Sequence, residues 1–563
     1  MSTTFDTAAI DTALADLTEG VKTWAATGLG RRRELLDELH ALTARDAEAW
    51  VAAARTIKQL DVDSPLVGEE WMSGPMTMLG GVQALSDTMA ALEQGASPLD
   101  GVDLGSAPGG RVSVPVLPHG IFDKLLLSGF SGEVWLRPGV DAATARRKAG
   151  LAQLTPAETN GVGAVLGAGN IMSIAPLDTL YELYANNRVV ALKLNPITDP
   201  LLPVLQAIFA PFIELGVVRI LTGGAAEGGY LVNHPQVAHV HMTGGAPTHD
   251  AIVWGTGEEG ARRKQAGEPA LTKPITSELG GVAPCIVIPG EWSAADLKFQ
   301  AEHVATMRLH NGGYNCVAAQ TVVLSADWPQ KQQFLTELRA AIDGAPARKA
   351  YYPGSDNRVA GALDSYPAAG RANGRVLVEN LPTEDTPLLG TEYFSPVLGV
   401  VELPGEDFLG NAVEFANDKL MGTLGANIIA HPDTIKALGA RLDSAIEDLR
   451  YGTVALNSWT GLAFLTPRAS WGAYPGHTID DVQSGIGVVH NAFLLDDVER
   501  TVVRGPFRPA PRSILAGEFS TTPKPPWFVA NKTGATTGRR LTEFYGDAKL
   551  RRLPGIFWSA LRG

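Results

Sequence analysis

Between residues 161 and 245 short apolar runs alternate with segments of helical character, and this alternation constrains the fold more than any other feature. The runs GVGAVLGAGN, RVVALKLNP, VVRILTG and VAHVHMTGG are predicted to be buried strands. Helical stretches are predicted between them, at 177–187, 200–215 and 225–233. Buried strands alternating with helices are typical of an α/β domain with a parallel sheet, which holds ligands where its strands end.

A second stretch of the same kind runs from about 283 to 485. Its strand candidates are PCIVIPG, AAQTVVLSA, RVLVENLP, SPVLGVVELP and TVALNS. Ahead of both stretches, residues 31–55 place four leucines at helical spacing, as an amphipathic helix does. A chain of 563 residues suits several domains rather than one.

The charge balance is acidic, with a formal net charge of −14 at pH 7. Nucleic-acid binding generally needs a basic surface, so we expect no nucleic-acid partner. The two cysteines are too few for a disulfide scaffold, which indicates a reducing compartment. The first 20 residues lack the basic character of a secretory or transit peptide, and prolines and charges interrupt the apolar stretch 201–221. We therefore expect a cytoplasmic protein without a transmembrane segment.

The end of the chain reverses this balance. Residues 501–563 hold 11 Lys and Arg against 3 acids, a net of +8, which leaves −22 for the first 500 residues. Its stretches PFRPAPR and TTPKPPW are Pro-rich and are predicted to be extended. This segment either wraps an acidic body, its own or a neighbouring subunit's, or binds an anionic partner or membrane surface through its apolar end GIFWSALRG.

Three residues are candidates for catalysis, although each has an ordinary structural explanation as well. Cys316 follows a glycine pair that lets the backbone approach a ligand, yet a lone cysteine is commonly inert core, as we expect of Cys285. Glu278 in SELGGVAP stands at the entrance of an apolar strand, where a solvated loop charge is equally natural. Asn170 follows the first predicted strand and suits a helix cap as well as a pocket amide.

Two further positions suggest a bound cofactor. The segment TGGAPTHD (243–250) predicts an exposed helix N-terminus, which favours a pyrophosphate, although the full G-x-G-x-x-G pattern is lacking. Lys193 closes the second predicted strand, where a lysine either bonds a cofactor ribose or is simply solvated.

The order and spacing of these residues are more specific than any one of them. Lys193 follows Asn170 by 23 residues, and four further motifs come after it: Met242-Thr243-Gly244-Gly245, Glu-Leu-Gly-Gly at 278–281, Asn-x-Gly-x-x-Cys at 311–316, and Glu392-Tyr393-Phe394-Ser395-Pro396. With NDKLMGTLGANI (417–428) and GTVALNS (452–458) downstream, the chain resembles the aldehyde dehydrogenase superfamily over roughly residues 20–500.

This resemblance implies an α/β fold with a Rossmann-like cofactor domain, an α/β catalytic domain and a small β-hairpin oligomerisation arm. The expected boundaries are 1–110 and 161–279 for the cofactor domain, 111–160 and 486–505 for the arm, 280–485 for the catalytic domain, and 506–563 for the basic tail. Because the arm joins subunits, a homodimer or homotetramer is expected.

The resemblance also implies a reaction, the NAD(P)+-dependent oxidation of a small-molecule aldehyde to a carboxylic acid. Cys316 would attack the aldehyde carbon, and the Asn170 amide with the Cys316 backbone N–H would stabilise the oxyanion. Glu278 would activate water to hydrolyse the thioester, a role that a pKa raised toward ~6–7 by partial burial suits. Lys193, Thr243, Gly244 and Gly245 would bind the cofactor, with Glu392 on the nicotinamide ribose and Phe394 against the nicotinamide. No metal ligand set is predicted.

Some positions depart from the pattern of that superfamily. Pro196 stands where many NAD-preferring relatives carry a glutamate that binds the adenosine ribose, so NAD and NADP both stay open. His249 replaces an expected glycine, and a segment rich in Gly and charge (255–270) is inserted before Glu278. Tyr314 stands where a glutamine is usual; with Trp459 and Phe464 it is a candidate for an apolar substrate lining.

Two other functions compete with hydrolytic oxidation. An acylating dehydrogenase or reductase, working between acyl-CoA or a fatty acyl thioester and an aldehyde, would share the nucleophile. A carboxylate that activates water has less purpose there, so Glu278 favours hydrolysis. A non-catalytic scaffold of the same fold would be natural if Cys316 or Glu278 were absent, and both are present.

Overall fold

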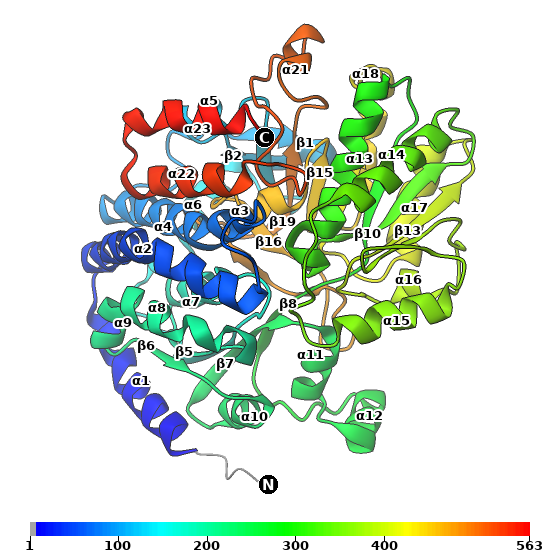
Figure 1. Ribbon diagram of the computed structural model, residues 1–563. Coiled ribbons are helices and arrows are strands. Elements are labelled where there is room, and N and C mark those ends of the chain that lie inside the picture. Colours follow the sequence, from blue (N-terminus) through cyan, green and yellow to red (C-terminus); the bar gives the residue numbers. More distant parts are fainter. Residues whose placement is uncertain (1–6) are drawn as a thin grey trace.

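The computed structural model describes residues 7–563, which form two large sheets covered by helices and a two-stranded sheet of β16 (Ser470–Gly472) and β18 (Val488–His490) (Figure 1). The smaller sheet has six strands in the order β17-β8-β7-β4-β5-β6. All neighbours pair in parallel except β17, which runs antiparallel to β8. The strands are β4 (Val162–Leu166), β5 (Val189–Lys193), β6 (Val218–Leu221), β7 (Val237–Gly244), β8 (Ile275–Leu279) and β17 (Gly485–Ile486).

The position of β4 in this sheet explains where a ligand would lie. The chain runs from β4 outward to β5 and β6, and then returns to the other side of β4 to form β7 and β8. Such a reversal leaves a crevice at the carboxyl ends of the central strands. The residues that follow β4, β5 and β7 therefore share one edge of the sheet.

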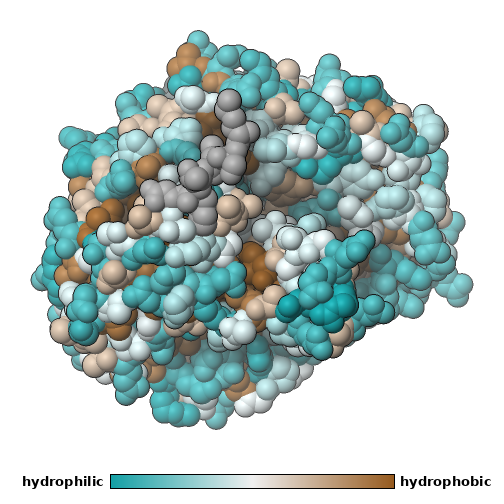
Figure 2. Space-filling model, turned by 90° about the horizontal axis from the view of Figure 1, so that it is seen from below, coloured by the Kyte–Doolittle hydropathy of each residue, from teal (hydrophilic) through white to brown (hydrophobic). Residues whose placement is uncertain are grey.

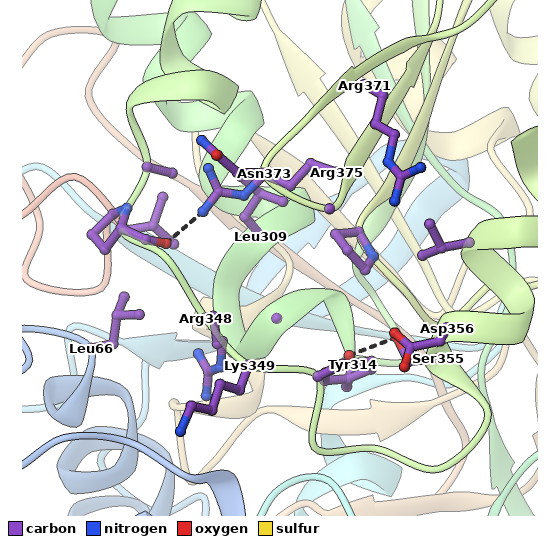
Figure 3. Close-up of a pocket in the computed structure, with 18 of the residues that line it drawn as sticks. Leu66, Leu309, Tyr314, Arg348, Lys349, Ser355, Asp356, Arg371, Asn373 and Arg375 are labelled. Carbon is purple, nitrogen blue, oxygen red and sulfur yellow. Dashed lines mark hydrogen bonds between the residues drawn. The ribbon is translucent and has the colours of Figure 1, made fainter.

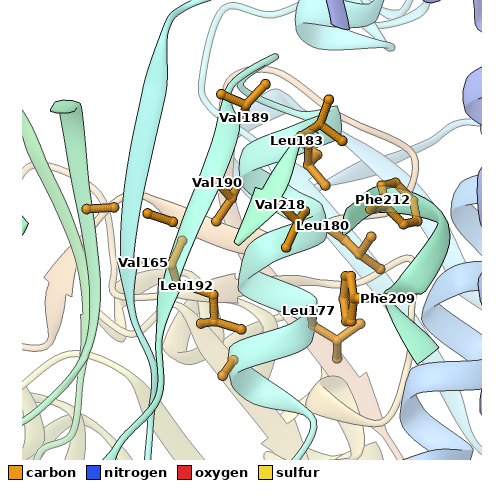
Figure 4. Close-up of a cluster of buried hydrophobic side chains, with 14 of the residues drawn as sticks. Val165, Leu177, Leu180, Leu183, Val189, Val190, Leu192, Phe209, Phe212 and Val218 are labelled. Atoms are coloured by element: carbon orange, nitrogen blue, oxygen red, sulfur yellow. The ribbon is translucent and has the colours of Figure 1, made fainter. Parts of the chain in front are cut away.

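Helices α1 (Ala8–Ala26) and α7 (Ile174–Tyr184) pack against this sheet, and α2 (Leu29–Lys58), α4 (Thr77–Glu93) and α10 (Ala225–Asn233) complete the layer. Their apolar side chains form one continuous core with the strands; Figure 4 shows Leu180 of α7 beside Val218 and Phe209. The predicted helix 200–215 is broken into a short turn η4 (Pro196–Leu201), α8 (Leu202–Ile208) and α9 (Ala210–Glu214). Prolines at 200, 203 and 211 cannot continue a helix interior, which accounts for the breaks.

The inserted segment before Glu278 is a helix rather than a loop. Helix α12 (Gly257–Ala266) follows α11 (Ala246–Val253), and most of its residues are exposed. The face that carries α10, α11 and α12 is mainly hydrophilic when seen from below (Figure 2).

The larger sheet has eleven strands in the order β1-β2-β3-β19-β15-β14-β9-β10-β13-β12-β11. The strands from β12 to β19 in this order are parallel. Helices α13 (Ala294–Leu309) and α17 (Phe408–Lys419) pack on it, with α14 (Lys331–Gly344) against α13 (Figure 1) and α19 (Ala440–Asp448) against α17. The strands are β1 (Gly105–Ala107), β2 (Arg111–Leu117), β3 (Ser131–Leu136), β9 (Ala283–Val287), β10 (Ala319–Ser325), β11 (Gly370–Ala372), β12 (Arg375–Val378), β13 (Val397–Leu403), β14 (Gly425–Ile429), β15 (Thr453–Leu456) and β19 (Val498–Arg504).

The strands of the predicted arm are part of this larger sheet. Strands β2 and β3 pair antiparallel, and β3 pairs antiparallel with β19. Strand β19 in turn pairs in parallel with β15 of the same chain. Both hydrogen-bonding edges of β19 are therefore occupied within one chain.

The C-terminal segment is more regular than its composition suggests. The two Pro-rich stretches have no long helix or strand, but α22 (Gly534–Asp547) and α23 (Leu553–Ala560) follow them as two helices that the sequence analysis did not predict. Helix α22 packs on α3 (Val67–Trp71) and α2, far away in sequence (red beside blue in Figure 1). Arg508 and Arg512 bind Asp296, and Lys524 binds Glu302. The segment thus wraps the acidic body of its own chain.

Within residues 7–563, no helix is both long and apolar enough to cross a membrane.

Candidate active site

The loop that carries Cys316 is bent by three consecutive left-handed residues. Asn311, Gly312 and Gly313 have φ angles of 55°, 71° and 83° in the turn η5 (His310–Gly313) that ends α13. A Cβ on Gly313 would approach the Ser395 carbonyl carbon to 2.9 Å. Glycine adopts this conformation without a steric penalty, which explains the Asn-Gly-Gly sequence two residues before Cys316.

Cys316 is partly buried and meets Glu278, which lies near the end of β8. Its thiol lies close enough to the Glu278 carboxyl group for each to shift the pKa of the other, and Trp471 Nε1 donates to Glu278 Oε1 at 3.1 Å. Burial raises the pKa of Glu278 to about 7. Burial and the Glu278 charge raise the pKa of Cys316, so the resting thiol keeps its proton beside an acceptor that titrates near neutrality. Cys285 is fully buried in β9, as expected of a core residue.

Asn170 lies between β4 and α7, and it is tied to the Cys316 loop in both directions. Its Nδ2 donates to the Tyr314 carbonyl at 2.9 Å, and Asn311 Nδ2 donates to the Asn170 carbonyl at 3.1 Å. An amide nitrogen carries two N–H groups, so the bond to Tyr314 leaves the second available. Asn170 and Cys316 line the same cavity.

Glu392 is the fourth predicted residue that the fold brings to this point. Burial and the Glu278 carboxylate raise its pKa to about 8, and Oε1 is a buried acceptor that receives no hydrogen bond within residues 7–563. A Cβ on Gly280 would stand 2.0 Å from this oxygen, which explains a glycine at 280. Phe394 has a φ of 41°, and its ring packs edge-on against Tyr352 with centroids 4.9 Å apart.

The remaining predicted residues lie where β5 and β7 end. Lys193 is the last residue of β5, and burial lowers its pKa. Gly244 ends β7, and Gly245 precedes α11. The Thr243 hydroxyl donates to Asp178 at 2.9 Å, so this side chain ties β7 to α7.

The departures from the superfamily pattern have clear structural consequences. Pro196 begins η4, where the Asn195 side chain accepts a hydrogen bond from the Ile197 N–H at 3.1 Å. The charges that act on Lys193 come from Asp199 and Glu227 instead. His249 is fully buried in α11.

The cavity at Cys316 is lined mainly by apolar side chains, and the prediction for its lining was right in part. Trp459 and Phe464 line it, as expected. Tyr314 does not: its hydroxyl donates to Ser355 at 2.7 Å and its ring lies on the other side of the loop. Trp471 and Trp527 also line the cavity, and no local sequence pattern marked them.

The sequence also does not predict a buried ionic cluster that contacts the Cys316 loop. Lys58 and Glu70 form a salt bridge of 2.8 Å with both side chains inaccessible to solvent. Glu69 binds Arg348 and accepts a hydrogen bond from the Asn311 N–H at 3.0 Å. The cluster therefore anchors the left-handed turn from the N-terminal helices. Lysine and glutamate are mostly exposed residues, so the sequence carries no signal for such burial.

A second, larger cavity of about 370 Å³ lies on the other side of the same loop. Figure 3 shows Arg348 and Lys349 on one side of this cavity and Arg371 and Arg375 on another. Tyr314 lies between Lys349 and Ser355. Cys316, Glu278 and Asn170 are not among its lining residues, so it is separate from the cavity at the thiol.

Comparison with known proteins agrees with this geometry. Residues 153–353 match the model of the aldehyde dehydrogenase family. Over these residues the chain is similar to the aldehyde dehydrogenase family. The matched region contains Asn170, Lys193, Glu278 and Cys316, and Glu392 and Phe394 lie beyond it.

Two relatives in this superfamily match about half of this chain. A D-glyceraldehyde dehydrogenase (NADP(+)) of Picrophilus torridus is 25% identical over 49% of this chain and 54% of its own length. A succinate-semialdehyde dehydrogenase [NADP(+)] 1 of Mycobacterium ulcerans is 28% identical over 43% and 51%. The chain thus spans about half the length of the curated relatives it matches.

The fold extends further than the sequence match. The structure of an NADP-dependent glyceraldehyde-3-phosphate dehydrogenase from Bacillus halodurans, complexed with NADP, superposes with a TM-score of 0.59. The superposition covers 88% of this chain and 91% of the other chain, and the two sequences are 18% identical. The two chains therefore share a fold, with a Rossmann-like sheet and a second α/β sheet.

Proposed function

We propose that this chain oxidises an aldehyde to a carboxylic acid with NAD+ or NADP+, through a hemithioacetal and a thioester on Cys316. The observation that carries the proposal is the buried contact between the Cys316 thiol and a Glu278 carboxyl whose pKa is about 7. A soft sulfur nucleophile with a base at its side, in a cavity that also holds an amide donor, is the equipment of acyl chemistry.

The first step uses this contact directly. Glu278 accepts the proton of Cys316, and the sulfur attacks the aldehyde carbon to form a C–S bond. The carbonyl oxygen becomes an oxyanion, for which the second N–H of Asn170 and the Cys316 backbone N–H are the donors. One such donor typically lowers the barrier by about 3 kcal/mol.

The residues present fit a nicotinamide dinucleotide. The Glu392 acceptor lacks a partner within the described chain, Gly280 leaves room beside it, and Gly244, Gly245 and Lys193 lie at the strand ends where a sheet of this topology binds dinucleotides. We propose that Glu392 binds the nicotinamide ribose, that Phe394 packs against the nicotinamide, and that the N-terminus of α11 faces the pyrophosphate. When bound, the cofactor accepts two electrons as hydride from the substrate carbon, which leaves a thioester on Cys316.

Hydrolysis then returns the enzyme to its starting state. Glu278 first releases the thiol proton to solvent and then takes a proton from water. The hydroxide adds to the thioester carbon, and the C–S bond breaks as the sulfur recovers the proton held by Glu278 and the acid leaves. The net change consumes one aldehyde, one NAD(P)+ and one water, and yields the acid, NAD(P)H and a proton. Because Pro196 leaves no carboxylate to repel a 2′-phosphate at that position, both cofactors are candidates.

The test is absorbance at the wavelength of the reduced cofactor, with an aldehyde and either NAD+ or NADP+, with and without CoA. We expect CoA-independent turnover that falls at least a thousandfold in Cys316→Ala and persists in Cys285→Ser, a matched change at the core thiol. Strict dependence on CoA would favour the acylating alternative. Full activity in Cys316→Ala would favour the scaffold alternative.

Assembly, location and domain boundaries stay predictions. The homodimer or homotetramer expected from the sequence is measured by light scattering; since both edges of β19 are paired within the chain, a subunit contact is expected on other surfaces. The cytoplasmic location rests on composition. The division into two sheets supports the boundaries proposed near residues 161 and 280, whereas the proposed boundary at 111 lies between the paired strands β1 and β2.

A further inference from the structure

The cavity at Cys316 has aromatic walls built from distant parts of the chain. Trp459 and Phe464 come from the segment after β15, Trp471 from β16 (Ser470–Gly472), and Trp527 from the C-terminal segment. Within the described chain, no Lys, Arg, Asp or Glu is among the residues that line it. An aldehyde that enters this cavity meets apolar surface on most sides.

The polar side chains of this cavity carry no charge at neutral pH. Burial lowers the pKa of His310 to about 4, and its ring packs on Trp459 with centroids 4.7 Å apart. The other polar groups are Ser73, Asn170 and Asn315, which are neutral. A carboxylate on the substrate tail would be buried here without a cationic partner, which is strongly unfavourable.

Another apolar cavity, which we call the proline-lined cavity, lies next to the cavity at Cys316. It shares Trp459 and Trp527 with the first cavity, so these two side chains stand between them. Its lining includes Phe130 and Phe299 and, from the C-terminal segment, prolines 506, 509, 523 and 525. Trp527 packs edge-on against Phe130, with centroids 5.9 Å apart.

The ionisable groups of the proline-lined cavity are also neutralised. Arg508 binds Asp296 at 3.0 Å and Glu518 at 2.9 Å, and burial lowers the pKa of His303 to about 3. The two cavities, of about 40 Å³ at the thiol and about 20 Å³ beside the C-terminal segment, share the walls made by Trp459 and Trp527.

We propose that the substrate is an uncharged aldehyde with a hydrocarbon tail, and that Trp527 is the partition that sets the length of the tail. The inference rests on the proposed function in one respect, that Cys316 attacks an aldehyde carbon. Trp527 is a specificity-determining residue, because its indole ends the cavity at Cys316 and separates it from the proline-lined cavity. A smaller residue at 527 joins the two cavities and admits a longer tail.

The first test compares Trp527→Ala with the wild type, using butanal, decanal and succinic semialdehyde. For the wild type we expect kcat/KM to be at least tenfold lower with succinic semialdehyde than with butanal. In Trp527→Ala the ratio of kcat/KM for decanal over butanal rises at least tenfold, whereas a misfolded variant would lose both activities. Trp527→Phe gives an intermediate ratio, and Trp558→Ala, which removes a tryptophan 63% exposed in the same segment, leaves the ratio unchanged.

A second test needs no dehydrogenase activity. Alkylation of Cys316 by N-butyl or N-decyl iodoacetamide forms a C–S bond, releases iodide and gives the thiol proton to Glu278; mass spectrometry follows the adduct. We expect both amides to react at least tenfold faster than iodoacetate, relative to their rates with a free thiol, and Trp527→Ala to favour the decyl reagent. If no aldehyde is oxidised but this preference holds, the proposed function fails and the pocket assignment stands. Equal relative rates for all three reagents, or an unchanged decyl-to-butyl ratio in Trp527→Ala, would overturn it.

Discussion

At the scale of single residues, the site depends on a carboxyl group that the fold buries. Glu278 on β8 is 4% exposed, and burial outweighs the hydrogen bonds from Cys316 and Trp471 in setting its pKa at about 7. An unperturbed glutamate would be fully ionised at neutral pH and a weak base. The raised pKa makes Glu278 strong enough to take a proton from a thiol or a water molecule at physiological pH.

This pKa predicts the pH dependence of turnover. With a pKa of about 7, about one tenth of the Glu278 carboxyl is ionised at pH 6 and about nine tenths at pH 8, so kcat limited by hydrolysis rises about tenfold. Glu278→Gln should abolish this rise and lower kcat by about 10²–10⁴-fold. The measurement is kcat against pH at saturating aldehyde and cofactor, with the exposed Glu268→Gln as control. A wild-type profile flat from pH 6 to 8 would contradict the assignment of Glu278 as base.

The same group affects stability with a defined sign. Since the folded pKa lies above the ordinary value, the folded state binds this proton more tightly, and its contribution is largest at low pH and is lost as pH rises through about 7. Glu278→Gln removes the cost of a buried charge, so relative to wild type it gains on the order of 2 kcal/mol more at pH 8 than at pH 5. Denaturant unfolding at the two pH values measures the difference, and it is independent of activity.

At the scale of elements, the sequence predicts what is encoded locally. The strands after residue 161 are apolar runs that end in glycine, lysine or proline, and β4, β5, β6 and β7 lie where these runs predict them. The break at Phe209 was not predicted, because the helix-forming residues of 200–215 suggested one continuous helix despite the prolines. Helices α22 and α23 were not predicted, because the prediction for this segment covered only its two Pro-rich stretches.

The site divides in the same way. Cys316, Glu278 and Asn170 stand in motifs with fixed spacing, so their proximity follows from a resemblance. Trp471 and Trp527 reach the cavity through contacts between residues far apart in sequence, and nothing in their immediate sequence distinguishes them from core tryptophans. The sequence predicts the Tyr314 ring in the cavity at Cys316, but the ring lies on the other side of the loop. The left-handed turn at Asn311, Gly312 and Gly313 redirects the chain there.

The turn itself gives a prediction at this scale. Gly313 and Gly139 have nearly equal φ angles, 83° and 88°, but a Cβ meets the Ser395 backbone at 313 and nothing within 4 Å at 139. Both alanine substitutions carry the left-handed penalty of about 1–2 kcal/mol. Only Gly313→Ala should displace the loop, lower kcat at least tenfold and slow alkylation of Cys316. Equal kinetics in the two variants would show that the close approach at 313 has no influence on the thiol.

At the scale of the whole molecule, two distant segments complete the catalytic half. Strands β2, β3 and β19 extend the catalytic sheet beyond β15, and the C-terminal segment covers the side of α13. Part of the net charge of +8 in that segment is balanced by acidic contacts, since Arg508, Arg512 and Lys524 bind carboxylates of α13. The pocket walls thus depend on a segment that lies outside the matched family region.

This dependence gives the last prediction. Asp296 is almost completely buried and binds both Arg508 and Arg512, so Asp296→Asn leaves Arg512 without its counter-charge and leaves Arg508 paired with Glu518 alone. Asparagine keeps an acceptor for the Ser293 N–H, so the cap of α13 survives. The arginines retain some exposure, which limits the loss to about 2 kcal/mol.

Because the loss falls on the contact between tail and body, hydrogen exchange should increase within 506–530 first, and KM for an apolar aldehyde should rise as the outer wall loosens. Glu48→Gln, which breaks the exposed pair with Arg539 in the same C-terminal segment, is the matched control and should change neither. Faster exchange in 506–530 with an unchanged KM would mean that the segment covers the body without shaping the substrate cavity. Unchanged exchange would mean that apolar contacts, and not the Asp296 ion pairs, hold the segment in place.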